Sequence, residues 1–564
     1  MAVLEQLDDG GRARALPRFS SDTRWLAAGA LAVCVLVLLP IVSLIWIGAT
    51  SGTDSMGRIA RYVLPQAAWT TALLMAGVAA LTAVIGTVSA WLVTFYRFPG
   101  RRVFAWALAL PLAVPTYLAA YAFVEFATFT GPLQGAYRAI FGFRTLQDYW
   151  FPEVRSLPGA VVVLSLVLYP YVFLSTRALF VLQGRRLVDA AGTLGAGHAR
   201  IFFTVLAPLA RPAVALGVTL ALMETLNDIG AVEFLGVPTL TFSVYSLWLN
   251  QGDLGGAAQL AIALFLVVLL LIVVERRARR NRHYAETRQG PARHTRPAYP
   301  LTGWRAGLAF LACLAPPALG FGVPFYILGG YALKRLDTIG DPKLIEALGT
   351  SILLAGGAAL LTVAAGLLLA YWGRLSRSRL AKAAIRVATV GYAVPGTIIA
   401  LGMLIPLAAL DNRIDALSRW LTGGGTGLLI TGSGALLLYA YAVRFLAMAE
   451  GTVDGGLKKL SPSLDMAART LGCNATRTAG KVLLPLAAPA LMTAGLLVFI
   501  DCLKELSATI LLRPFGLHTL STYIYEFASM ARQNEAGIAA LFIVVTGMVP
   551  AFLLSRLMLP RERG

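Results

Sequence analysis

Charged side chains are scarce in this chain. Only 13% of its 564 residues are Asp, Glu, Lys or Arg, whereas 58% are hydrophobic and the mean hydropathy is +0.72. A composition this apolar excludes a soluble globular protein. Cysteine is equally rare: the four residues Cys34, Cys313, Cys473 and Cys502 form no CxxC pair, which argues against a disulfide framework or a zinc site.

Motifs for catalysis are also missing. The sequence contains no GxxxxGK[ST] phosphate loop, no HExxH and no GxSxG, and it has only four histidines. We therefore expect a protein that is not an enzyme, with no catalytic residue and no cofactor of its own. The sequence leaves open whether any residues bind a metal.

Long apolar runs are abundant. Each is at least 18 residues long, enough to cross a hydrocarbon core of about 30 Å as a helix. They lie at about 26–50, 66–96, 103–130, 159–181, 203–235, 257–274, 304–333, 347–372, 383–410, 427–449, 482–512 and 536–557. The predicted fold class is all-α, a polytopic membrane protein with about twelve transmembrane helices.

Basic residues indicate the orientation of these helices. They gather near the N-terminus, at Arg97 to Arg102, at Arg185 and Arg186, in 276–296, in 374–386, at Lys458 and Lys459, and in the C-terminal tail. With twelve spans all of these fall on one face, which the positive-inside rule makes cytoplasmic. Both termini are then cytoplasmic. The net charge of +20 follows from this distribution and does not require a nucleic-acid partner.

An internal repeat divides the chain. Residues 188–214 align without a gap with 465–491, and 13 of the 27 positions are identical. A basic, Pro-containing linker at 275–303 separates a first half, 1–274, from a second half, 304–564. Because each half has six spans, the repeats are parallel and related by a pseudo-twofold axis along the membrane normal.

The repeated segment predicts a protruding helix, turn and helix. Asp189 is expected to begin a short helix, with its carboxylate near the helix N-terminus. Gly195 and Gly472 permit a sharp break, and Pro208 and Pro485 mark the start of the next span. Such an element on the cytoplasmic face is suited to docking another protein.

The spacing of this segment resembles the EAA loop found in permease subunits of binding-protein-dependent ABC importers. The matching positions are Asp189, Ala190, Ala191, Gly195, Val205 and Pro208 in the first copy, at about 185–210, and Ala467, Ala468, Gly472, Val482, Leu484 and Pro485 in the second, at about 462–487. Met466 stands where the acid is expected, and Asp465 lies one residue early.

This resemblance implies the MetI-like fold of type I importers in a bacterial plasma membrane. It also implies that each loop is a coupling helix held in a cleft of an ATPase subunit. The ATPase, a dimer, would bind ATP as a separate subunit, and an extracytoplasmic solute-binding protein would deliver the substrate.

Further motifs are similar to those of fused ferric-iron permeases. They are METLNDIGAVEFLG (223–236), DCLKELSATILLRPFGLHTLSTYIYEFA (501–528), GYAVPGTIIALG (391–402) and AYAVRFLAM (440–448). The similarity implies ferric iron as cargo, while thiamine, a polyamine or another small solute stays open. An ion-coupled secondary transporter with parallel repeats is the alternative from a different class.

Charged residues inside the apolar runs are candidates for the translocation path. Glu224 and Asp228 align with Asp501 and Glu505, and Lys504 lies beside the second pair. The acids could face one another across the pseudo-twofold axis and attract a hard cation such as Fe3+. Alternatively, they form hydrogen bonds and ion pairs, such as one from Lys504, that only hold the bundle together.

Overall fold

The computed structural model describes residues 24–51, 57–181, 185–280, 299–376, 378–530 and 532–558. These residues are almost entirely helical, which confirms the all-α prediction. The exceptions are two parallel strands of two residues each, β1 (Tyr96–Arg97) and β2 (Tyr299–Pro300). The predicted basic N-terminus, most of the linker and the basic tail lie outside the described residues.

Long helices form most of both halves. In the first half they are α1 (Arg24–Thr50), α3 (Leu64–Phe95), α7 (Leu157–Leu179), α10 (Ala207–Asn227) and α13 (Leu254–Arg280). In the second half they are α14 (Trp304–Pro317), α15 (Val323–Lys334), α16 (Pro342–Leu375), α18 (Gly396–Thr422), α19 (Ala435–Lys458), α22 (Leu484–Leu503) and α25 (Gln533–Met558). Within the described residues, ten helical segments are long and apolar enough to cross a membrane, and a bent pair makes eleven. The chain is a multi-pass membrane protein.

Two predicted spans, 103–130 and 383–410, are wrong as straight helices. In the first, α4 (Arg101–Ala107) and a 3-10 turn lead to Val114, after which α5 (Thr116–Ala127) starts in a new direction. The helical segments on either side of this break differ in direction by 96°. Val114 has ψ 119° because a following proline disfavours the helical conformation.

The second half has the same interruption. Here α17 (Arg379–Ala388) and a 3-10 turn lead to Val394, which has ψ 122° and precedes Pro395 and α18. The AVP sequence shared by the two halves therefore marks a break and not a span centre.

The predicted spans 203–235 and 482–512 are too long. The first ends with α10 at Asn227 and is followed by α11 (Gly230–Phe234), and the second ends with α22 at Leu503 and is followed by α23 (Ser507–Leu512). At both places the chain folds back after a charged capping residue, because a carboxylate there accepts the free N–H groups of the next short helix.

Two short helices that follow the fold-back, α12 (Leu240–Tyr245) and α24 (Leu520–Ser529), are bonded to the long helices at matching positions. Leu240 N donates to Thr71 Oγ1 at 2.9 Å, and Leu520 N donates to Ser351 Oγ at 2.7 Å. Each pair spans 169 residues, so the duplication extends to tertiary contacts.

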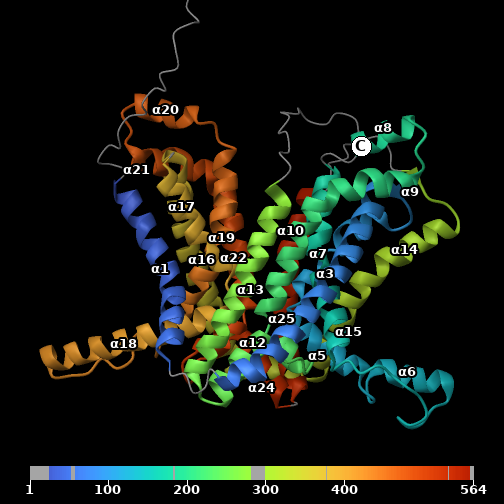
Figure 1. Ribbon diagram of the computed structural model, residues 1–564, viewed down its shortest axis with the longest axis horizontal. Coiled ribbons are helices and arrows are strands. Elements are labelled where there is room, and N and C mark those ends of the chain that lie inside the picture. The colour runs from blue at the N-terminus through green and yellow to red at the C-terminus, as the bar shows by residue number, and fades with distance from the viewer. Residues whose placement is uncertain are drawn as a thin grey trace, which may run out of the picture.

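The two halves exchange their first helices. Helix α1 packs against α16, α17 and α18 of the second half, whereas α14 packs against α3 and α4 of the first half. Figure 1 shows α1 beside the second-half helices and α14 beside α3 and α7. Gly402 makes this crossing possible, because a Cβ there would collide with the backbone carbonyl of Pro40 in α1.

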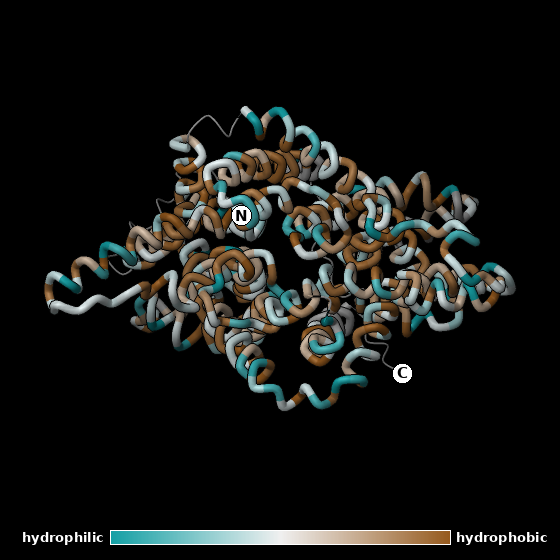
Figure 2. The backbone as a smooth tube through the Cα atoms, turned by 90° about the horizontal axis from the view of Figure 1, so that it is seen from below, coloured by the Kyte–Doolittle hydropathy of each residue, from teal (hydrophilic) through white to brown (hydrophobic). Residues whose placement is uncertain are grey.

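Several helices protrude at the two ends of the molecule. Helices α8 (Arg185–Thr193) and α20 (Ser463–Thr470) lie at one end, which we call the loop end. Helix α6 (Pro132–Phe141) and α18 project outward in opposite directions near the other end (Figure 1). Viewed from that end, the helices are mainly hydrophobic and the same two projections extend along the long axis (Figure 2).

Candidate functional site

The first repeated loop is a helix, a left-handed turn and a second helix. After α8, Gly195 has φ +78°, a conformation that glycine adopts without strain. Ala196 N donates to Ala191 O at 3.1 Å, which closes the helix end. The chain then enters α9 (His198–Ile201) and a π-helical turn that leads into α10, with Pro208 in its first turn.

The second loop repeats this geometry. Gly472 has φ +81°, and Cys473 N donates to Ala468 O at 3.0 Å. Helix α21 (Ala475–Thr478) follows, and Pro485 lies in the first turn of α22. The turns expected at both glycines are therefore present.

The acids of the two loops are not equivalent. Helix α8 begins at Arg185, so Asp189 lies in its middle, and the expectation that it starts the helix is wrong. In α20, Asp465 Oδ2 forms an ion pair with Arg374 Nη2 at 2.7 Å. The same arginine donates hydrogen bonds to the carbonyls of Leu457 and Leu460. Asp465 thus ties the second loop to α16, while Met466 is 61% exposed.

A leucine precedes each turn glycine and points outward. Leu194 is 87% exposed and Leu471 is 83% exposed, and the two are aligned in the repeat. We did not select them from the sequence, although their identity in both copies was visible there. An apolar side chain this exposed at a tip is typical of a contact with another protein.

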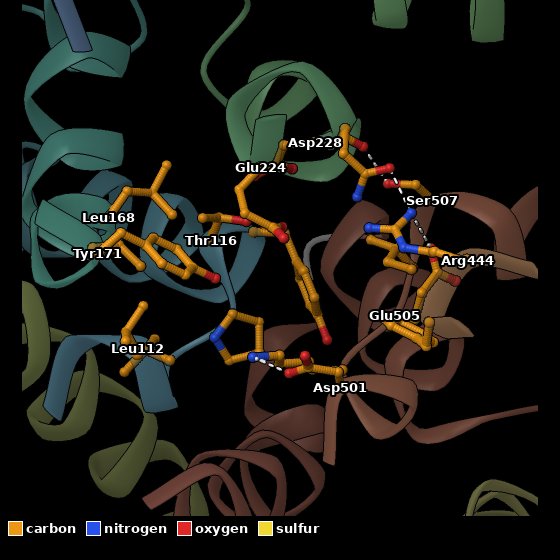
Figure 3. Close-up of a pocket in the computed structure, with 18 residues that line it drawn as sticks. Leu112, Thr116, Leu168, Tyr171, Glu224, Asp228, Arg444, Asp501, Glu505 and Ser507 are labelled. Atoms are coloured by element: carbon orange, nitrogen blue, oxygen red, sulfur yellow. Dashed lines mark hydrogen bonds and ion pairs between the residues drawn. The ribbon is translucent and has the colours of Figure 1, made fainter. Parts of the chain in front are cut away.

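The ends of α10 and α22 enclose a polar cavity of about 80 Å³ (Figure 3). Its walls include the four acids and the lysine predicted from the sequence, and they also include three polar residues that we did not predict, Tyr171, Asn227 and Arg444. The structure thus brings Glu224, Asp228, Asp501, Lys504 and Glu505 together from both halves.

The two second-half acids are both paired. Asp501 Oδ1 lies 2.8 Å from Lys504 Nζ, and Glu505 Oε1 lies 3.3 Å from Arg444 Nη1. Glu505 also accepts hydrogen bonds from the N–H groups of Ala508 and Thr509 at the start of α23. These carboxylates are neutralised by neighbouring cations and help to shape the fold.

The two first-half acids form no ion pair with a described residue. Asp228 Oδ1 accepts the Ala231 N–H at 2.8 Å, and the side chain of Thr116 lies beside its carboxylate in the cavity wall. Glu224 Oε1 accepts a hydrogen bond of 3.4 Å from Tyr392 Oη. The cavity therefore has unbalanced negative charge on its first-half side when both acids are ionised.

Asn227 makes several hydrogen bonds between the halves at the cavity. Its Oδ1 accepts hydrogen bonds from Arg444 Nη1 at 2.5 Å and from Gly396 N at 2.7 Å, and its carbonyl accepts one from Ser507 Oγ at 2.6 Å. The repeat places Lys504 opposite Asn227, so this contact has no symmetric copy. The sequence signal for Arg444 was its isolation in an apolar run.

Glu125 is an acid within the predicted span 103–130. Its Oε2 accepts a hydrogen bond from Tyr331 Oη at 3.1 Å, a structural contact between the halves. Among the described residues, no group of three or more His, Cys, Asp or Glu side chains is arranged to hold a metal ion.

Two interlocked helical repeats around a charged cavity, each with a protruding loop, define the class of membrane transport permeases. Two stretches, 82–280 and 362–564, match the family described as binding-protein-dependent transport system inner membrane component. Together they cover more than half of the chain, so the protein belongs to this family of ABC importer permeases, and it is not an enzyme.

Characterised relatives show how the similarity is distributed. An Fe(3+)-transport system permease protein of Haemophilus influenzae is 26% identical over 538 residues, covering 94% of this chain and 98% of the relative. The sulfate transport system permease CysT of Escherichia coli is 30% identical over 39% of this chain and 76% of its own length. The molybdenum transport permease ModB of the same organism is 29% identical over 36% and 88%.

Proposed function

We propose that this protein is the permease subunit of an ATP-driven importer for ferric iron in a bacterial inner membrane. The observation that carries the proposal is the uneven charge of the central cavity, where Glu224 and Asp228 form no ion pair with a described residue. Unpaired carboxylate oxygens favour a hard cation over an oxyanion. The similarity to an Fe(3+)-transport permease over 94% of the chain supports the same cargo.

In this proposal the cation crosses along the pseudo-twofold axis. Glu224 and Asp228 attract it, while the Asn227 and Arg444 contact closes the path between the halves. A path must bind its ion weakly enough to release it, and two carboxylates with few fixed partners suit brief binding better than a complete coordination sphere.

Energy would reach the cavity through the repeated loops. Helices α8 and α20 lie at the same end of the molecule, so a pair of ATPase subunits could hold both at once (Figure 1). Each loop leads directly into the helix that ends at the cavity, α10 or α22. Closure of the ATPase dimer on ATP would draw the loops together and change the distance between these helix ends.

The loop end is cytoplasmic in this proposal, and a solute-binding protein delivers iron to the opposite end. We infer the orientation from the basic residues near α8, α17 and the end of α13. Family membership argues against an ion-coupled secondary transporter.

Cargo is tested by uptake. A strain that lacks this gene, and that has no second iron importer expressed, should lose uptake of radioactive ferric iron and retain uptake of sulfate, molybdate, thiamine and spermidine. Restoration by the wild-type gene is the control. Normal iron uptake with loss of one of the other solutes would reject ferric iron and identify the cargo.

Docking is tested at the exposed leucines. Leu194→Glu and Leu471→Glu should each weaken co-purification of the ATPase in mild detergent, because a charge replaces an apolar contact. Leu336→Glu, at an exposed leucine between α15 and α16 and outside both loops, is the matched control. Equal ATPase recovery with all three variants would remove these loops from docking.

A further inference from the structure

Two projections extend from the protein near the end opposite the loops. The α6 arm consists of α6 and residues 142–151, and the α18 arm consists of residues 410–431. They come from different halves, share no evident sequence similarity and extend from opposite sides of the molecule (Figures 1 and 2). Neither belongs to the cavity or to the coupling loops.

Several polar side chains of the α6 arm are used within the protein. Gln134 is 6% exposed, donates to Ala127 O at 2.7 Å and accepts a hydrogen bond from Tyr149 Oη at 2.5 Å. Arg138 donates to Phe129 O at 2.6 Å and lies over the Phe129 ring. Asp148 accepts two backbone N–H groups, which lower the pKa of its carboxyl.

The apolar side chains of the α6 arm point away from the protein. The exposed fractions are 39% for Leu133, 75% for Ile140, 59% for Phe141, 58% for Leu146 and 84% for Trp150. Leu133 and Ile140 are two turns apart on the helix and therefore share one face. In water, this arrangement of polar groups inside and apolar groups outside would be unfavourable.

The α18 arm has the same inverted arrangement. Asp411 is fully buried and accepts from Ile430 N and Thr431 Oγ1, Asp415 accepts from Gly427 N, and Ser418 donates to Gly424 O. These polar residues follow one face of the helix and bind the returning segment. The outer face of the helix exposes Leu410, Leu417, Trp420 and Leu421 around Arg413, and the returning segment exposes Leu428 and Leu429.

We propose that both arms lie in the lipid interface of the membrane, as flat anchors of the two halves. The partner they fit is the boundary between acyl chains and headgroups, where apolar side chains are buried by about 5–10 Å and aromatic rings are favoured. The apolar surface continues onto the lipid-facing side of α1, which α18 crosses and which exposes Val42, Ile45 and Trp46. A soluble protein partner would instead meet few free polar groups on these faces.

Depth measurements on the full-length protein in nanodiscs test this proposal. Nitroxide labels are attached at Ile140→Cys and Leu417→Cys, with Arg144→Cys and Asn412→Cys as exposed polar positions on the same arms, and the labelled wild-type protein corrects for the four native cysteines. We expect the labels at 140 and 417 to be accessible to oxygen, shielded from a soluble nickel chelate, and about 5–10 Å below the lipid phosphates. Labels at 144 and 412 should be more accessible to nickel.

Tryptophan fluorescence gives a second measurement that needs no added cysteine. A double variant, Trp150→Phe with Trp420→Phe, is compared with the wild-type protein. The fraction of tryptophan emission that brominated lipids quench should fall in the double variant, and the fraction that aqueous iodide quenches should be unchanged. Loss of the iodide-quenched fraction instead, or equal nickel accessibility at all four labelled positions, would overturn the proposal. These readouts are independent of the transported substrate.

Discussion

At the scale of single residues, equivalent positions of the duplicated chain have different surroundings. Glu224 and Asp501 align in the repeat, yet within the described residues Asp501 alone of the two has an ion-pair partner, because Lys504 replaces the asparagine of the first half. Asp228 and Glu505 both cap a short helix, but Arg444 forms its ion pair with Glu505. We therefore expect the first-half acids to act on the cation and the second-half acids to support the structure.

Neutral amides at the acids test this division. Glu224→Gln and Asp228→Asn should each slow ferric iron uptake about tenfold, equivalent to about 1.4 kcal/mol, with little change in detergent melting. Asp228→Asn keeps an oxygen to accept the Ala231 N–H. Initial rates in proteoliposomes at equal protein content are the measurement.

Glu505→Gln is the matched comparison. It should lower the melting temperature, because it leaves Arg444 buried without its anion, an effect of about 3–5 kcal/mol for a fully buried pair. Unchanged uptake in both first-half variants would remove those acids from the path.

The contact at Asn227 predicts a coupling defect. Asn227→Leu is nearly the same size but removes the acceptor for both Arg444 and Gly396, so the halves should separate more easily. We expect ATP hydrolysis by the assembled transporter to rise without binding protein, while uptake per ATP falls. Hydrolysis that still depends fully on the binding protein would show that this contact does not hold the path closed.

At the scale of elements, each coupling loop depends on a backbone conformation. Gly195 and Gly472 have positive φ and open space around the position of a Cβ, so strain and not crowding would oppose a larger residue. Proline has the corresponding role at the interrupted helices, where it directs α5 and α18 away from the elements that precede them.

Valine substitutions test the loop turn. Gly195→Val should displace α8 and reduce ATPase binding at least severalfold, because a β-branched residue is strongly disfavoured at φ +78°. Gly197→Val, two residues away, is the control, since Gly197 has open space and no positive φ. Co-purification in mild detergent compares the two, and equal recovery would argue against a role for this turn in docking.

At the scale of the whole molecule, the exchange of first helices makes the two halves interdependent. Helix α1 packs against α16, α17 and α18 of the second half as well as α13 of its own, and α14 packs against α3 and α4 of the first half, so neither half contains all of its own packing partners. A movement started at one coupling loop is consequently transmitted to helices of both halves.

An added methyl group tests this crossing. Gly402→Ala should lower the melting temperature of the detergent-solubilised protein, because its Cβ meets the Pro40 carbonyl and overpacking costs about 1–3 kcal/mol. Gly349→Ala, in α16 with open space around it, should be neutral or stabilising by up to about 1 kcal/mol. Equal melting temperatures of the two variants would mean that α1 and α18 can move apart at this crossing without loss of stability.

The sequence by itself determined the class, the duplication and the location of the loops. Hydrophobic runs specify membrane helices because backbone groups must pair internally in lipid, and glycine and proline mark turns through local sterics. These signals are local, so the all-α fold, the turns at Gly195 and Gly472 and the meeting of the four acids were predictable.

Only the tertiary structure decided which charges are paired, where the interrupted helices turn and which half supports α1. Arg444 is 61 residues from Glu505 and 217 from Asn227 along the chain, and no local pattern connects them. The same hydrophobic pattern describes a spanning helix and an arm lying in the interface. Long-range packing distinguishes them, because it determines which polar groups are satisfied within the protein and which apolar faces are left for the lipid.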